Sequence, residues 1–187
     1  PYATRPEYLT IWKKAKSEHY PEIDKIESEL GFAINSEWYH KLALHTQVVI
    51  KESKICYQHG RILYSVLCSY INSNYYEQIN IIEIGTARGF SSICMAAALE
   101  KMQVKGSITT IDPLPHNHKT FWNCINDLEG ENSRKDILCD YKNLTTKYIN
   151  FIEGKSVNVL KKSIYPRIHF AFVDGEHEYN SIILEFQ

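Results

Sequence analysis

The chain has 187 residues, of which 44% are hydrophobic, so it is long enough for one domain with a sizeable core and too short for two ordinary ones. Its 21 Lys and Arg residues balance 22 Asp and Glu residues, and basic pairs such as Arg134-Lys135 are scattered, so we expect no nucleic-acid partner. The apolar runs are far shorter than a membrane span and the polar start lacks the apolar core of a secretory signal, so we expect no membrane association and a soluble, cytoplasmic protein.

The first part of the chain is predicted to be helical. Residues 1–34 are polar and aromatic and indicate short helices on the outside of the fold. Ser36 is a good N-cap for a helix over 37–50, and an apolar stripe predicts another helix over 60–71. We interpret 1–58 as an N-terminal helical extension and 59–187 as the main domain.

From Asn80 onward, short apolar runs alternate with helical segments. The predicted strands cover 80–85, 107–112, 148–154 and 168–175, and the predicted helices cover 91–102 and 156–162. Strands that alternate with helices predict an α/β fold with a parallel, doubly wound sheet and right-handed crossovers. The longer polar segment 113–146 is expected to contain one or two helices of its own.

Acidic residues or glycines follow all four predicted strands. The strands end in Glu83-Ile84-Gly85, Asp112, Glu153-Gly154-Lys155-Ser156 and Asp174-Gly175-Glu176-His177. In doubly wound sheets ligands bind outside the carboxyl ends of the strands, near the point where the strand order reverses. The sequence therefore predicts a site on one rim of the sheet.

The turn after the first strand indicates the class of ligand. Gly85 to Gly89 reads G-x-x-x-G, which is neither the G-x-G-x-x-G of dinucleotide folds nor a G-K-[ST] phosphate loop. Asp112 lies 23 residues after Gly89, a distance at which an acid reaches ribose hydroxyls. S-adenosylmethionine fits, because it is a nucleoside with a sulfonium, an amino-acid end and no phosphate. Glu83, placed inside an apolar strand, would lie near its ammonium group, and the helix after Gly89 would receive its carboxylate.

Structural roles can explain the same residues one at a time. Gly85 and Gly89 would each suit a tight strand-to-helix turn, and Asp112 would suit a turn before Pro113. Ser156 would suit the N-cap of the following helix. Taken singly, each residue is equally compatible with structure and function, and only their joint occurrence favours a site.

Two longer stretches resemble known methyltransferases. The stretch IIEIGTARGFSS, over 81–92, resembles the first motif of class I S-adenosylmethionine-dependent methyltransferases, in the form found in catechol and caffeoyl-CoA O-methyltransferases. The stretch HFAFVDGEHEY, over 169–179, resembles the D-G-x-H-x-Y motif of the macrocin and mycinamicin O-methyltransferases, which methylate sugar hydroxyls. Residues 60–63 also resemble the helix that precedes the cofactor site in these enzymes.

The resemblance implies a Rossmann-like class I methyltransferase fold and a role for each matching residue. Glu83, Gly85 and Ser91 would line the methionine end of the cofactor together with Thr86 and Gly89 of the same turn, Asp112 would hold the ribose, and Ser156 would lie beside the adenine. Asp174 matches a Mg²⁺ ligand and His177 a general base. The implied reaction is metal-assisted O-methylation of a sugar or other small polyol.

The sequence departs from the family at its C-terminal end. Class I sheets normally have seven strands, and the related enzymes take further acidic metal ligands from the strand that would follow Gln187. We therefore expect a domain truncated after its fourth strand, as a piece of a longer enzyme; the alternative is a non-catalytic nucleoside-binding or interaction domain. A nicotinamide-binding domain is disfavoured by Ala87, where a glycine is wanted. An exposed fourth strand and the helical extension are compatible with a homodimer.

Overall fold

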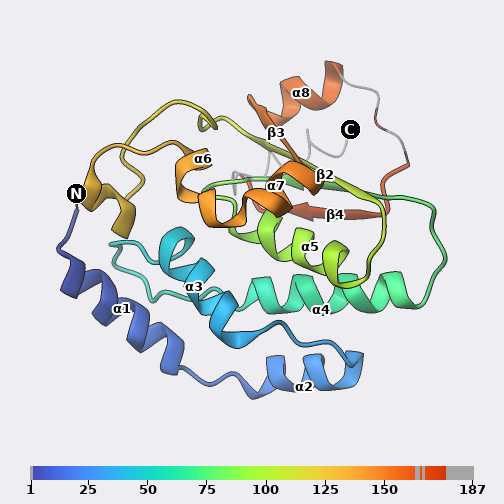
Figure 1. The fold of residues 1–187 in the computed structure, drawn as a ribbon, viewed down its shortest axis with the longest axis horizontal. Coiled ribbons are helices and arrows are strands. Elements are labelled where there is room, and N and C mark those ends of the chain that lie inside the picture. The colour runs from blue at the N-terminus through green and yellow to red at the C-terminus, as the bar shows by residue number, and fades with distance from the viewer. Residues whose placement is uncertain (1, 163–164, 166, 176–187) are drawn as a thin grey trace.

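The computed structural model of the chain describes residues 2–162, 165 and 167–175, whose arrangement is shown in Figure 1. In chain order the elements are α1 (Arg5–Ser17), α2 (Pro21–Leu30), α3 (Ser36–Thr46), α4 (His59–Asn72), β1 (Ile79–Ile84), α5 (Phe90–Lys101), β2 (Gly106–Asp112), the 3₁₀ helix η1 (Ile125–Glu129), α6 (Arg134–Ile137), the 3₁₀ helix η2 (Cys139–Tyr141), α7 (Lys142–Tyr148), β3 (Ile149–Glu153), α8 (Ser156–Lys162) and β4 (Phe170–Val173). Within the described residues, no helix has the length and apolar content that crossing a membrane would require.

The four strands form one parallel sheet in the order β3-β2-β1-β4. The chain moves outward from β1 through β2 to β3 and then returns to the other side of β1 to form β4. This reversal places the switch point of the sheet at the carboxyl ends of β1 and β4, where ligands bind in folds of this kind. The predicted parallel, doubly wound sheet is confirmed.

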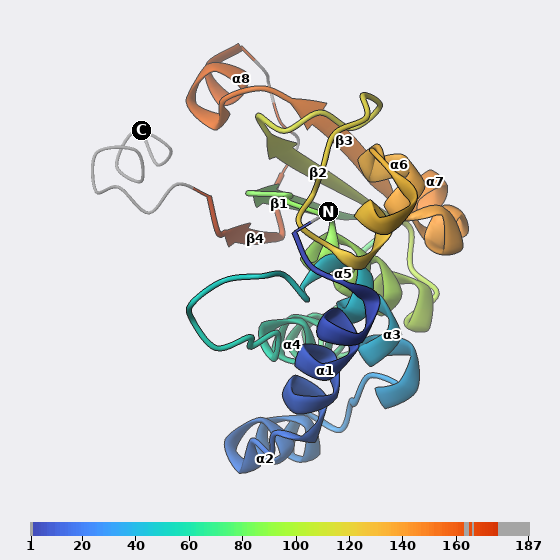
Figure 2. The same ribbon diagram turned by 90° about the vertical axis from the view of Figure 1, so that its left-hand side faces the viewer.

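Helices α4 and α5 cover one face of the sheet, and α8 lies on the other side (Figure 2). Nine of the 12 residues of α5 are buried, because the helix packs against α4 on one side and against β2 on the other. Ile79 and Ile81 of β1 belong to this main core. Since side chains alternate along a strand, Glu83 faces the same helical layer.

The N-terminal helices pack on this core as well. Tyr39, Leu42 and Ala43 of α3 belong to the same cluster of buried side chains as the residues of α5. Arg61 of α4 binds Glu27 of α2, which is only 9% exposed. The division after residue 58 remains a prediction, and the apolar core is continuous across it.

The ends of α3 differ from the expected ones. Asn35, and not Ser36, is the N-cap, because its side-chain oxygen accepts the Trp38 N–H at 2.9 Å. The helix ends at Thr46 and not near residue 50, since Val48 is fully buried in a second apolar cluster with Tyr8. Local periodicity did not reveal this second cluster, whose members are far apart in the sequence.

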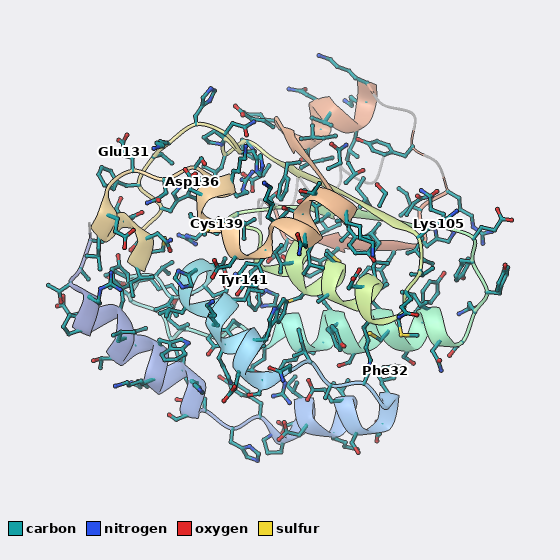
Figure 3. All side chains as sticks on the ribbon, in the orientation of Figure 1. Phe32, Lys105, Glu131, Asp136, Cys139 and Tyr141 are labelled. Carbon is teal, nitrogen blue, oxygen red and sulfur yellow. The ribbon has the colours of Figure 1, made fainter. Side chains whose placement is uncertain are left out.

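The segment between β2 and β3 returns to the helical layer. Tyr141, labelled in Figure 3, belongs to the main core, and its ring meets that of Trp38 edge to face at 5.4 Å between centroids. The aromatic contact anchors this long segment to α3, at a distance from the rim of the sheet. Ile125 of the same segment packs with Tyr8 and Val48 in the second apolar cluster.

Candidate functional site

A cavity of about 580 Å³ opens at the carboxyl ends of the strands. Gly85, Asp112, Ser156 and Asp174, which follow or end four different strands, all line it. Its volume lies within the range of about 300 to 1,000 Å³ that small-molecule sites occupy. The structure thus brings together one predicted site residue from each strand end, while their role as ligands of a cofactor remains a prediction.

The glycine turn brings the ends of β1 and β4 into contact. Gly85 has φ of +93°, and a Cβ built on it would lie 2.1 Å from the Asp174 carbonyl oxygen, so no other residue fits there. Gly89, the N-cap of α5, has φ of +90°, and a Cβ built on it would lie 2.7 Å from a methyl group of Leu138. Both glycines are therefore required by the turn itself. Gly85 also lines the cavity, whereas Gly89 packs behind it.

Glu83 is held by hydroxyl groups inside the fold. The side chain is 0% exposed, and its Oε2 accepts hydrogen bonds from the hydroxyls of Ser92 and, at 2.5 Å, Thr110. Since the Thr110 hydroxyl has one proton, Thr86 must donate in the 2.6 Å contact between the two threonines. The pKa of Glu83 is raised, because the effect of burial exceeds the opposite effect of the hydroxyl donors.

The position of Glu83 differs from the one that the sequence suggested, beside the ammonium group of a ligand. Its carboxylate does not line the cavity, and neither do Thr86 and Ser91, which are also buried. Its Oε1 has no hydrogen-bond partner among the described residues. Contact between Glu83 and a ligand's ammonium remains a prediction. The sequence analysis missed Thr110, although the parallel register places this polar residue directly opposite Glu83.

Asp112 combines a structural role with a place in the cavity. Its carboxylate is 6% exposed and accepts the backbone N–H of Leu114 at 2.7 Å and that of Ala87 at 2.8 Å. The first contact is the turn before Pro113 that the structural interpretation expected. Because a carboxylate offers about four acceptor positions, it retains capacity for a ligand's hydroxyl group.

Arg134, which the sequence presented as part of a scattered basic pair, is buried beside Asp112. Its side chain is 1% exposed, and a terminal nitrogen lies 3.5 Å from Asp112 Oδ1. The capping pattern of Ser133 and Asp136 could have located the start of α6. Its burial depends on Trp122 and Phe151, over whose rings the guanidinium lies. No local signal predicts those two contacts.

The remaining predicted residues divide between the cavity and the undescribed part of the chain. Ser156 is the first residue of α8, and the N–H of Asp174 donates to the Ile84 carbonyl at 2.8 Å, which continues the pairing of β1 with β4. His177 lies outside the described residues. Among those that are described, no group of three His, Cys, Asp or Glu side chains could hold a metal ion. The predicted Mg²⁺ site at Asp174 is therefore not supported.

One further histidine lies close to the switch point. His59, at the start of α4, is stacked on Phe172 with 6.2 Å between ring centroids and also contacts Phe90. The pKa of His59 is lowered, because the effect of burial exceeds that of the nearby Asp174 carboxylate, which raises it. The sequence analysis did not single out this imidazole, because nothing in its local pattern relates it to β4.

Comparisons with known proteins identify the family. A family model described as a methyltransferase domain matches residues 82–187, which is more than half of the chain, so the chain belongs to this methyltransferase family. The resemblance to class I S-adenosylmethionine-dependent methyltransferases is thereby confirmed, together with the Rossmann-like fold. No curated protein matches the chain.

Solved structures with a similar course of the chain are distant in sequence. The SAH-bound methyltransferase PaMTH1 of Podospora anserina is 14% identical, with a TM-score of 0.44 over 84% of this chain and 58% of its own. Cofactor-bound Rv0187 from MTB is also 14% identical, with a TM-score of 0.49 over 100% of this chain and 67% of its own. The chain thus spans about three fifths of the length of these proteins.

Proposed function

We propose that this chain binds S-adenosylmethionine at the rim of its sheet and serves the O-methylation of a sugar or other small polyol. The observation that carries the proposal is the cavity itself, in which a buried carboxylate, Asp112, stands beside an apolar wall at the switch point. The proposal concerns the activity of the whole protein, of which this chain supplies the cofactor-binding part.

The lining of the cavity suits a nucleoside without phosphates. Ile111, Leu114 and Val157 offer apolar surface for a flat base, and Asp112 offers acceptor positions for ribose hydroxyls. Lys155 is the one cation among the described lining residues, so no cluster of cations is available to grip a pyrophosphate. These features support a sulfonium nucleoside over a dinucleotide.

The chemistry requires close positioning and removal of one proton. Bound S-adenosylmethionine would supply an electrophilic methyl group. The chain must hold the acceptor oxygen in line with that methyl, and such positioning can contribute about 7 to 11 kcal/mol. As the acceptor oxygen takes the methyl carbon from sulfur it must lose its proton, and we assign this proton to His177, because an unperturbed imidazole titrates near neutral pH.

Calorimetry with S-adenosylmethionine, S-adenosylhomocysteine and NAD tests the cofactor class. We expect the first two ligands to bind and NAD to fail, and failure of S-adenosylhomocysteine to bind would overturn the proposal. Transfer of labelled methyl groups to a panel of sugars and polyols, with and without added Mg²⁺, then tests the reaction. Binding without transfer by the full-length protein would favour the alternative of a non-catalytic binding domain.

His177→Ala separates binding from chemistry. In the full-length protein we expect this variant to bind S-adenosylhomocysteine with unchanged affinity and to lose methyl transfer. Turnover at the wild-type rate would remove His177 from the role of base.

A further inference from the structure

Arg134 is a buried cation in contact with two loops of the cavity. Its Nε donates to the Ala87 carbonyl of the glycine turn at 2.7 Å, and its Nη2 donates to the Leu114 carbonyl, after β2, at 3.1 Å. The same Nη2 lies 3.5 Å from Asp112 Oδ1. One guanidinium therefore links the turn after β1, the loop after β2 and the carboxylate between them.

The burial of this charge requires compensation. A charged group removed from water costs several kcal/mol unless it is paired and hydrogen-bonded. Burial accordingly lowers the pKa of Arg134, and the Asp112 carboxylate raises it. The rings of Trp122 and Phe151 cover the guanidinium at 5.5 and 5.9 Å from its central carbon. The polar contacts of this buried cation are two backbone carbonyls and Asp112, which is the buried carboxylate among the described residues that line the cavity.

The backbone at Ala87 shows what Arg134 fixes. Ala87 has φ of +44°, in the left-handed region that residues with a side chain rarely adopt. Asp112 accepts its N–H and Arg134 binds its carbonyl, so both adjoining peptide groups are held. Ala87 itself lines the cavity. Loss of the guanidinium would release one of these two restraints and leave Asp112 without its buried cation.

We propose that Arg134 is a positioning residue for the nucleoside: it holds Ala87 and Asp112 so that the carboxylate presents its remaining acceptor positions to the ribose hydroxyls. The inference rests on the proposed binding of S-adenosylmethionine and adds a residue to that site. Arg134 itself does not line the cavity, so it acts through Asp112.

The test compares S-adenosylhomocysteine with its 2′,3′-dideoxy analogue, which lacks both ribose hydroxyls. Wild-type protein is expected to bind the dideoxy analogue on the order of 10- to 100-fold more weakly, since its carboxylate loses charged hydrogen bonds. In Arg134→Met we expect this ratio to fall to roughly 3-fold or less, because Asp112 is no longer held. Arg134→Lys, which keeps the charge but cannot reach both carbonyls and the carboxylate, should fall in between.

Arg61→Met serves as the matched control. Arg61 is also partly buried and ion-paired, but the residues that its guanidinium binds, Asp24, Glu27 and Gln58, do not line the cavity. This variant should lose stability and keep the wild-type ratio. The inference would be overturned if folded Arg134→Met discriminated between S-adenosylhomocysteine and its dideoxy analogue as strongly as the wild type does. If Arg134→Met does not fold, the same result in Arg134→Lys would overturn it. If wild-type protein binds no S-adenosylhomocysteine, the proposed function is wrong, and the inference about Arg134, which depends on it, is wrong as well.

Discussion

Arg61 and Arg134 are both withdrawn from water in this fold, and their surroundings differ. Arg61, in the helical layer, is bound by side-chain oxygens: Glu27 at 3.0 Å, Asp24 at 2.6 Å and Gln58 at 3.1 Å. Arg134, at the rim of the sheet, binds two backbone carbonyls and approaches a single carboxylate at 3.5 Å.

The difference is visible in the protonation equilibria. The hydrogen bonds that Arg61 donates to Glu27 raise the pKa of Arg61, whereas burial lowers the pKa of Arg134. Arg61 joins α4 to α2 through hydrogen bonds to the carboxylates of Glu27 and Asp24. Arg134 holds the loops at Ala87 and Leu114 and leaves Asp112 with acceptor positions for a ligand. The contacts of Arg61 thus stabilise the helical layer, whereas those of Arg134 hold a carboxylate that lines the cavity.

The largest effect is expected from Gly85→Ala, which breaks the rim. A Cβ at this position would meet the Asp174 carbonyl at 2.1 Å in a left-handed backbone, so the ends of β1 and β4 must separate. We expect a loss of more than about 3 kcal/mol of unfolding free energy in urea, because backbone strain and the steric clash both contribute, and no detectable binding of S-adenosylhomocysteine.

Gly31→Ala is the control for Gly85→Ala in the helical layer. Gly31 has φ of +75° and no atom of the described residues within 4 Å of the added Cβ, so only backbone strain of about 1 kcal/mol is expected. Equal losses in the two variants would show that the contact between β1 and β4 contributes nothing.

Arg61→Met is expected to have the next largest effect on stability and none on binding. Removal of one partner from a buried ion pair costs about 3 kcal/mol, because Glu27 remains buried without its cation. Urea unfolding measures the loss and calorimetry measures the affinity for S-adenosylhomocysteine. A fall in affinity comparable with that of Arg134→Met would remove the distinction between the two arginines.

Asp112→Asn tests the ligand-binding capacity of the rim directly. The amide keeps one oxygen as an acceptor for the backbone but loses the charge, so we expect binding of S-adenosylhomocysteine to weaken by about tenfold or more. Asp112→Ala should abolish binding altogether. Unchanged affinity in a folded Asp112→Asn variant would leave Asp112 with only its turn-forming role.

The smallest effect concerns the pH dependence of Glu83. Because burial raises the pKa of this acid in the folded state, wild-type protein should lose stability as the pH rises from the unfolded pKa, near 4.5, through the folded value. Glu83→Gln removes the titration, so its stability relative to wild type should increase over that window, by at most about 1.4 kcal/mol per pH unit. Urea unfolding at several pH values provides the measurement. The opposite slope would mean that the hydroxyl donors outweigh burial.

The rim was largely predictable because its main features are local. Apolar runs located the strands, their alternation with helices implied parallel pairing, and the carboxyl ends of parallel strands share one edge. Gly85, Asp112, Ser156 and Asp174 could therefore be placed together without any knowledge of their contacts.

The sequence by itself determined the parallel sheet and the polar residues at the strand ends, because each depends on periodicity and on the order of elements along the chain. The strand order, and with it the position of the switch point, came from the tertiary structure. Only the tertiary structure decided that Thr110 and Ser92 bind Glu83, that Asn35 replaces Ser36 as a cap, and that Arg134 lies buried beside Asp112. Burial of a polar side chain is set by neighbours that are distant in sequence, and those neighbours meet only when the layers pack.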